Sequence, residues 1–223
     1  MQDDDKKLAA EAALAEIRDG MRVGIGTGST MAFAIAAIGA RLAEWPTATF
    51  FATSQATWRA AHAAGITIGR FADMATLDLA IDGADEVDPR LRAIKGAGGA
   101  MLREKIVASA AARMVVVADG SKRVAALGKA PVPVEILPFA RSFAEARLSA
   151  LGADPVLRMS PDKAYRTNQG NLILDCHFGA IADPEKLAVD LQAIPGALGH
   201  GLFLSEVDVA YVAQDGIVTK MER

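Results

Sequence analysis

The sequence predicts an α/β fold in which a doubly wound, mostly parallel, Rossmann-like sheet is joined to a smaller α+β subdomain. Apolar runs rich in Val, Ile and Phe alternate along the first half of the chain with alanine-rich segments of helical period. The apolar runs are nearly continuous, as in strands that helices cover on both faces. Three prolines within residues 131–138 then indicate a crossover into a second unit.

The first unit is predicted to contain six buried strands with helices between most of them. The helical segments carry apolar residues at the spacing of one helix face. The predicted strands cover residues 22–27, 49–54, 66–71, 77–82, 91–96 and 114–119, and the predicted helices cover residues 30–44, 55–64 and 99–112.

The second unit has a different order of elements. Strand, helix, strand, strand, helix and strand are predicted over residues 132–137, 140–151, 154–159, 171–178, 184–193 and 201–205. This βαββαβ order is typical of ferredoxin-like folds. A last hairpin, VDVAYV and IVTKM around an Asp215–Gly216 turn, is expected to return to the first sheet. The expected domains are therefore 1–127 plus 206–223 and 128–205.

Composition narrows the class of protein. The 223 residues are 52% hydrophobic and 23% charged with a formal net charge of −3, as in ordinary globular proteins, and nothing indicates a nucleic-acid partner. Cys176 is the only cysteine, so an intramolecular disulfide and a cysteine-based zinc cluster are both excluded. The acidic start MQDDDKK and the lack of an apolar run of about 18 residues argue against a signal peptide and a membrane span. We expect a cytoplasmic protein.

The segment GTGST, residues 26–30, leaves the first predicted strand and opens a helix. Ligands of open parallel sheets bind at such carboxyl ends of strands. Backbone N–H groups around Gly28 could hold an anion, with hydroxyl donors from Thr27, Ser29 and Thr30. A plain tight turn with Ser29 or Thr30 as helix N-cap explains the same pattern. A dinucleotide fingerprint and a P-loop are excluded, because neither the third glycine nor a Gly-Lys-Ser/Thr sequence is present.

The segment IDGADEVD, residues 81–88, ends another predicted strand with carboxylates. Asp82 and Asp85 are candidate ligand-binding groups, and Gly83 and Ala84 between them leave room for a ligand near the backbone. A magnesium site made by two carboxylates stays open, as does a solvated acidic turn.

Two further carboxylates of this segment, Glu86 and Asp88, are interpreted as surface charge. A calcium-binding EF-hand loop starting at Asp82 is excluded, because its sixth and twelfth positions hold Val87 and Ala93 in place of glycine and glutamate.

Two lysines and one glutamate complete the candidate set. Lys95 precedes a glycine cluster in which Gly96, Ala97 and Gly98 can expose N–H groups to a ligand. Glu104 lies in the following helix, away from its apolar stripe and without a lysine four residues on. Lys122 follows a further strand in ADGSK. Ordinary surface positions remain the alternative for Glu104 and Lys122, but together these loops suit a phosphorylated polyhydroxy substrate and a carbon acid.

The segments VGIGTGST, IDGADEVD, IKGAGGAMLREKIV and ADGSK, with LGKAPVPVEILP and NLILD, closely resemble ribose-5-phosphate isomerase of type A. The resemblance covers nearly the whole chain. It implies interconversion of D-ribose 5-phosphate and D-ribulose 5-phosphate in the non-oxidative pentose phosphate pathway, without a metal or other cofactor, in a homodimer or homotetramer. Two segments depart from the family pattern, SQAT at 54–57 and FLSEVDVAYV at 203–212, where Glu206 replaces a small or basic residue.

The resemblance also implies roles for individual residues. Glu104 matches the base that moves a proton between C1 and C2 through a cis-enediolate. Asp82, Asp85 and Lys95 match residues that bind the sugar oxygens, assist ring opening and stabilise developing charge. The loop from Thr27 to Thr30 and Lys122 match phosphate contacts, and Lys6 matches a further one.

The histidines of the sequence help to distinguish hydride transfer from proton transfer as the mechanism of such an isomerase. Isomerases that shift a hydride need a divalent metal, often held by histidines, whereas His62, His177 and His200 are scattered and are interpreted as structural. Proton transfer by a glutamate is therefore favoured. A sugar-phosphate sensor without turnover, an amino-sugar phosphate deaminase and a phosphogluconolactonase are the alternatives.

Overall fold

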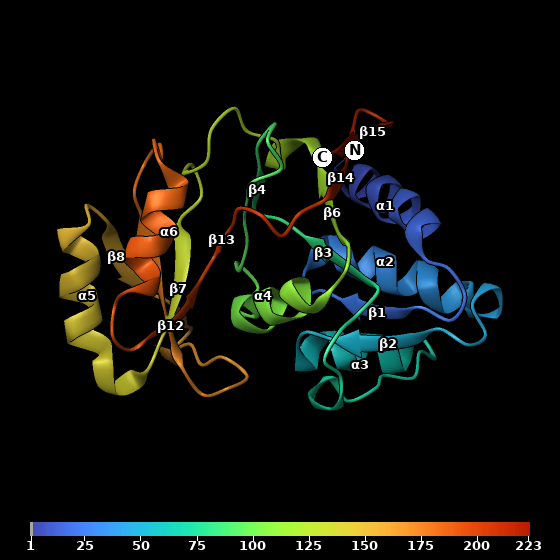
Figure 1. The fold of residues 1–223 in the computed structure, drawn as a ribbon, viewed down its shortest axis with the longest axis horizontal. Helices are drawn as coiled ribbons and strands as arrows, with labels where there is room; N and C mark the ends of the chain where they lie inside the picture. Colours follow the sequence, from blue (N-terminus) through green and yellow to red (C-terminus); the bar gives the residue numbers. More distant parts are fainter. Residues whose placement is uncertain (1) are drawn as a thin grey trace.

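The computed structural model describes residues 2–223 and is organised around a six-stranded sheet (Figure 1). Its strands, in spatial order, are β15 (Ile217–Glu222), β14 (Val209–Gln214), β6 (Met114–Asp119), β3 (Leu79–Gly83), β1 (Arg22–Ile25) and β2 (Thr49–Ala52). All neighbours pair in parallel except β14 and β15. The predicted mostly parallel sheet is confirmed, and so is the return of the last hairpin to it.

Helices cover both faces of this sheet, as a doubly wound fold requires. They are α1 (Gln2–Ala13), α2 (Ser29–Ala40), α3 (Gln55–Ala63) and α4 (Met101–Ala110). Apolar residues of α1 and α2 pack with Val23, Ile81 and Val117 on one face, whereas Met101 and Val107 of α4 pack with the opposite face. No helix in the described part of the chain combines the length and hydropathy that crossing a bilayer requires.

A four-stranded antiparallel sheet forms the second unit, at the left of Figure 1. Its strands, in spatial order, are β12 (Ala197–His200), β7 (Val132–Ile136), β11 (Leu172–His177) and β8 (Asp154–Leu157), and its helices are α5 (Arg141–Ala150) and α6 (Pro184–Gln192). The chain order βαββαβ and this pairing are those of a ferredoxin-like unit. We retain the division into 1–127 plus 206–223 and 128–205 as a proposal, because the two groups of strands form separate sheets.

Three strand predictions differ from the structure. Residues 66–71 make only an isolated bridge to β2, because this largely exposed segment runs past the edge of the sheet. Residues 91–96 contribute only β5 (Ala93–Ile94), in a small antiparallel sheet with β4 (Glu86–Val87) and β13 (Leu202–Phe203), and not a parallel strand. The strand predicted at 201–205 is replaced by β12, which ends at His200, and by β13.

The interpretation of Glu86 and Asp88 as surface charge is wrong. Their residues are 2% and 1% exposed. Glu86 accepts hydrogen bonds from the backbone N–H groups of Gly128 and Ala130, 42 and 44 residues further along the chain. Asp88 accepts from the backbone of Arg90 and Arg92 and pairs with the Arg92 guanidinium, which closes the turn before β5. Both carboxylates satisfy buried backbone donors, so they shape the loops that flank the large sheet.

Replacement of Glu86 by glutamine is expected to destabilise the protein. The amide nitrogen would face one of the two N–H groups that the carboxylate now accepts, which leaves a buried donor unpaired at a cost of about 1–3 kcal/mol. Urea unfolding of Glu86→Gln measures this loss, with Glu11→Gln on the exposed face of α1 as the matched control. Equal free energies of unfolding for the two variants would contradict the assignment.

Candidate active site

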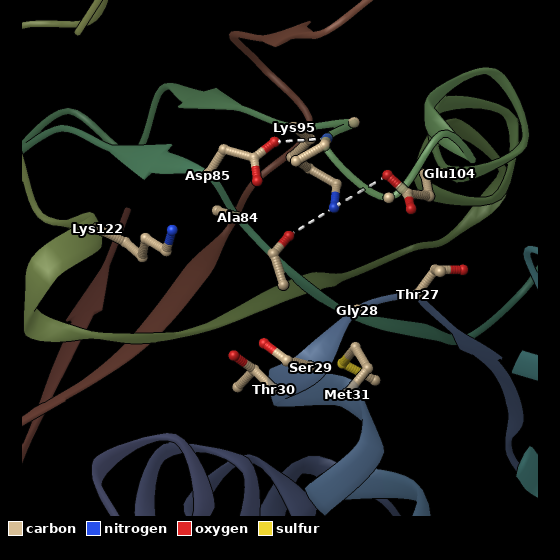
Figure 2. Close-up of a pocket in the computed structure, with 14 residues that line it drawn as sticks. Thr27, Gly28, Ser29, Thr30, Met31, Ala84, Asp85, Lys95, Glu104 and Lys122 are labelled. Carbon is tan, nitrogen blue, oxygen red and sulfur yellow. Dashed lines mark hydrogen bonds and ion pairs between the residues drawn. The ribbon is translucent and has the colours of Figure 1, made fainter. Parts of the chain in front are cut away.

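A pocket of about 290 Å³ opens at the carboxyl ends of β1 and β3. These neighbouring strands lie at the point where the chain order of the sheet reverses, since β2 follows β1 on one side and β3 lies on the other. The glycine-rich loop after β5 and the turn after β6 close the pocket (Figure 2). Its lining residues are Thr27, Gly28, Ser29, Thr30, Met31, Gly83, Ala84, Asp85, Lys95, Gly96, Ala97, Gly98, Glu104 and Lys122.

The structure thus brings together four loops that are far apart in the sequence. Every residue singled out from the sequence for substrate binding or catalysis lines this pocket, except Asp82 and Lys6. Met31, in the first turn of α2, also lines it and carried no signal in the sequence. Lys6 is not among the lining residues, and its ammonium lies 3.1 Å from Asp3.

Lys95 is the centre of the charged cluster. Its side chain is 2% exposed, and its Nζ lies 2.9 Å from Oδ2 of Asp82 and 3.3 Å from Oε2 of Glu104. The same ammonium donates a hydrogen bond to the backbone carbonyl of Gly83. Figure 2 shows the side chain of Lys95 extending from its loop toward the carboxylate of Glu104.

Glu104 lies in the first turn of α4, with 3% of its residue surface exposed. Its Oε2 contacts Lys95 as an ion pair but lacks a hydrogen-bond partner in the described part of the chain. Burial, helped by the nearby charge of Asp82 and opposed by that of Lys95, raises the pKa of Glu104 to about 8. A carboxyl with such a pKa can take up and return a proton near neutral pH, as a general base must.

Burial lowers the pKa of Lys95, but the charges of Asp82 and Glu104 outweigh this effect and raise it overall. The ammonium therefore stays charged. Burial likewise raises the pKa of Asp82 against the attraction of Lys95. Two carboxylates and one ammonium share a dry site, so one carboxyl is favoured in its protonated form.

Asp82 lies behind Lys95 and outside the pocket lining. Its Oδ1 accepts the backbone N–H groups of Thr27 at 3.1 Å and Gly83 at 2.7 Å, which ties the loops after β1 and β3 together. A side-chain carbon at Gly26 would lie 1.8 Å from this oxygen, so only glycine allows the approach. In this geometry Asp82 acts on the pocket through Lys95 and the two loops.

Asp85 and Lys122 reach the pocket from its other side (Figure 2). The Asp85 carboxylate accepts the backbone N–H of Ala97 at 2.9 Å and so joins the acidic loop to the glycine loop. Lys122 ends a single turn of 3₁₀ helix, Gly120–Lys122, that Asp119 caps by accepting the N–H of Ser121. The cap directs the chain after β6 back over the pocket.

The GTGST segment forms the predicted junction between β1 and α2. Gly28 has φ +128°, which is open to glycine, and α2 starts at Ser29 with its first-turn N–H groups at the pocket. Neither Ser29 nor Thr30 is the N-cap that the alternative interpretation required. Backbone donors at a helix N-terminus favour a bound phosphate.

The hydroxyl of Thr27 does not serve as the anion donor expected from the sequence. It makes hydrogen bonds with Thr53, Ser54 and Thr57 at 2.8–3.0 Å, and Thr57 in turn donates to the carbonyl of Gly26. Sequence reasoning missed these three supporting residues. The available signal was their position just after β2, which neighbours β1 in the sheet.

The model of the family ribose 5-phosphate isomerase A (phosphoriboisomerase A) matches residues 49–216. The chain belongs to the ribose-5-phosphate isomerase A family. It is 47% identical to ribose-5-phosphate isomerase A of Sphingopyxis alaskensis over 98% of this chain and 96% of that protein. It is 51% identical to ribose-5-phosphate isomerase A of Roseiflexus castenholzii over 96% of this chain and 93% of that protein. A D-ribose-5-phosphate isomerase solved in complex with phospho-erythronic acid superposes with a TM-score of 0.97 and 37% identity, over 100% of both chains.

Proposed function

We propose that this protein interconverts D-ribose 5-phosphate and D-ribulose 5-phosphate, with Glu104 moving a proton between C1 and C2 through a cis-enediolate. Membership of the ribose-5-phosphate isomerase A family supports the reaction. The observation that carries the mechanism is the buried Glu104 carboxyl, with its raised pKa, 3.3 Å from the Lys95 ammonium in a pocket. A base of this kind can remove a carbon-bound proton only if the resulting charge is stabilised nearby.

Lys95 supplies that stabilisation in the proposed mechanism. When Glu104 takes the proton from one carbon, negative charge develops on the neighbouring oxygen, and the fixed ammonium and the N–H groups of the glycine loop favour it. The hydroxyl proton on O2 passes to O1, and Glu104 returns its proton to the adjacent carbon, so that the carbonyl moves from C1 to C2. Because the cluster is dry and its partners are already in place, little reorganisation is needed at the moment of reaction.

The remaining residues bind the rest of the substrate. Asp85 lines the pocket and can accept hydrogen bonds from sugar hydroxyls and assist ring opening, and Asp82 holds Lys95 in position. The first turn of α2, with Ser29 and Thr30, and the ammonium of Lys122 suit the phosphate. A related structure holds phospho-erythronic acid, a phosphorylated polyhydroxy acid of the class that such a pocket would accept.

We further propose that the reaction needs no metal or other cofactor, because the general base and the ammonium supply the proton transfer and charge stabilisation themselves. We also propose that the protein acts in the cytoplasm, in the non-oxidative pentose phosphate pathway. A sensor without turnover, a deaminase and a lactonase are less favoured, since the described relatives carry the name of the isomerase.

The protein is also proposed to form a homo-oligomer, a dimer or a tetramer. Large apolar side chains are exposed in the single chain near the start of α5, among them Phe139 in the preceding 3₁₀ turn and Phe143 in the helix, at 101% and 51%. Sedimentation equilibrium at micromolar concentration is expected to give a multiple of the chain mass, and a monomer would contradict the proposal.

Replacement of Glu104 by glutamine tests the proposed function most directly. The amide keeps the shape of the side chain but cannot take a proton, so kcat is expected to fall about 10²–10⁴-fold while ribose 5-phosphate still binds. The measurement is conversion of ribose 5-phosphate in D₂O with a chelator present. The chelator is expected to leave the rate of the natural protein unchanged. The ketose that it forms is expected to carry solvent deuterium.

The matched control is Glu44→Gln, which alters an exposed glutamate paired with Arg41. Near-normal turnover of Glu104→Gln would remove Glu104 from the mechanism. Loss of activity on chelation would instead revive a metal site at the acidic loop.

A further inference from the structure

One arginine of the second unit contacts the glycine-rich loop after β5, which lines the pocket. Arg158 lies between β8 and β9 (Met159–Ser160), and its backbone N–H donates to the carbonyl of Ile173 at 2.9 Å. Its side chain is 14% exposed. The Nη1 group donates to the carbonyl oxygens of Gly96 at 2.8 Å and Ala97 at 3.1 Å.

The rest of the guanidinium is held by a carboxylate of the same sheet. Nε of Arg158 donates to Oδ2 of Asp175 at 2.8 Å, and Nη2 donates to Oδ1. This two-point contact fixes the plane of the guanidinium. Arg158 can therefore present Nη1 to the loop in one orientation only.

The carbonyl and N–H groups of the loop point in different directions. The carbonyls of Gly96 and Ala97 point out to Arg158, whereas the N–H of Ala97 points to Asp85. Gly96 has φ +113°, a conformation that other residues rarely adopt. Tyr165 also braces the loop from outside, because a side-chain carbon at Gly99 would lie 2.3 Å from its hydroxyl oxygen.

Two residues of the proposed chemistry depend on this loop. Lys95 precedes it, and α4, which carries Glu104, follows it. Arg158 does not line the pocket of about 290 Å³ itself. It borders a neighbouring cavity of about 370 Å³ together with Asp85, Ala97 and Lys122. Its hydrogen bonds to the residues that line the active-site pocket go to the carbonyls of this loop, so we expect its effect on the reaction to pass through the loop.

We propose that Arg158, held by Asp175, is a positioning residue for the isomerisation, which fixes the loop between Lys95 and Glu104 from the second sheet. The inference rests on the proposed function. The phosphate end of the substrate would be held by the first turn of α2, which Arg158 does not touch in the described structure. Loss of Arg158 therefore affects the alignment of Lys95 and Glu104 more than substrate binding.

Three variants separate positioning from charge and from general stability. Arg158→Met removes the guanidinium, Arg158→Lys keeps the charge but not the fork, and Asp175→Asn weakens the two-point hold. The matched control is Arg147→Met on the exposed face of α5. In all three variants kcat is expected to fall about 10–100-fold with KM changed by less than about threefold. The control is expected to keep both values.

Hydrogen exchange gives a readout that does not depend on turnover. Backbone amides of residues 96–99 are expected to exchange faster in Arg158→Met than in the natural protein, while amides of β6 keep their rates. This readout also separates the two proposals. Should the natural protein fail to isomerise ribose 5-phosphate, the proposed function would fall, and exchange alone would decide whether Arg158 orders the loop.

The outcomes are distinct. Lower kcat at similar KM, with faster exchange confined to the loop, supports the positioning role. Wild-type kcat in Arg158→Lys would overturn it, because charge without the fork would then suffice. Unchanged loop exchange in folded Arg158→Met would overturn it as well.

Discussion

The buried ammonium of Lys95 is the interaction on which the site depends. It lies between Asp82 and Glu104, and all three side chains are almost fully excluded from solvent. Burial raises the pKa of Glu104, and the charge of Asp82, which the single ammonium opposes, contributes further to the rise. The same arrangement keeps Lys95 charged. A base near neutrality and a fixed cation therefore arise from one cluster.

The fold supplies this cluster by bringing strand ends together. β1 and β3 are neighbours at the reversal of strand order, which places the GTGST turn beside Asp82. Lys95 directly follows β5 of the small antiparallel sheet of β4, β5 and β13, and Glu104 lies on α4. This small sheet and α4 pack on the same face of the six-stranded sheet. The second sheet contributes Arg158 and Asp175 to the glycine loop. Both units thus meet at the loop that joins Lys95 to Glu104.

Much of this could be predicted from the sequence, because ligand loops of parallel sheets follow apolar strands and their polar residues stand out there. Partnerships across long separations could not be predicted. Glu86 appears in the sequence as part of a charge run, yet it accepts N–H groups of Gly128 and Ala130. The inward direction of the Thr27 hydroxyl and the place of Asp82 behind Lys95 depend on neighbours that only the folded chain provides.

The central claim is that the Lys95 cluster sets the proton affinity of Glu104. A ¹³C NMR titration of the Glu104 carboxyl, assigned by its loss in a Glu104→Gln sample, measures this directly in the natural protein and in Asp82→Asn. The account predicts a pKa of about 8, well above 4.5, in the natural protein. It predicts a lower pKa in Asp82→Asn, because Lys95 would then act on Glu104 without the second carboxylate. A pKa near 4.5 in both proteins would contradict it.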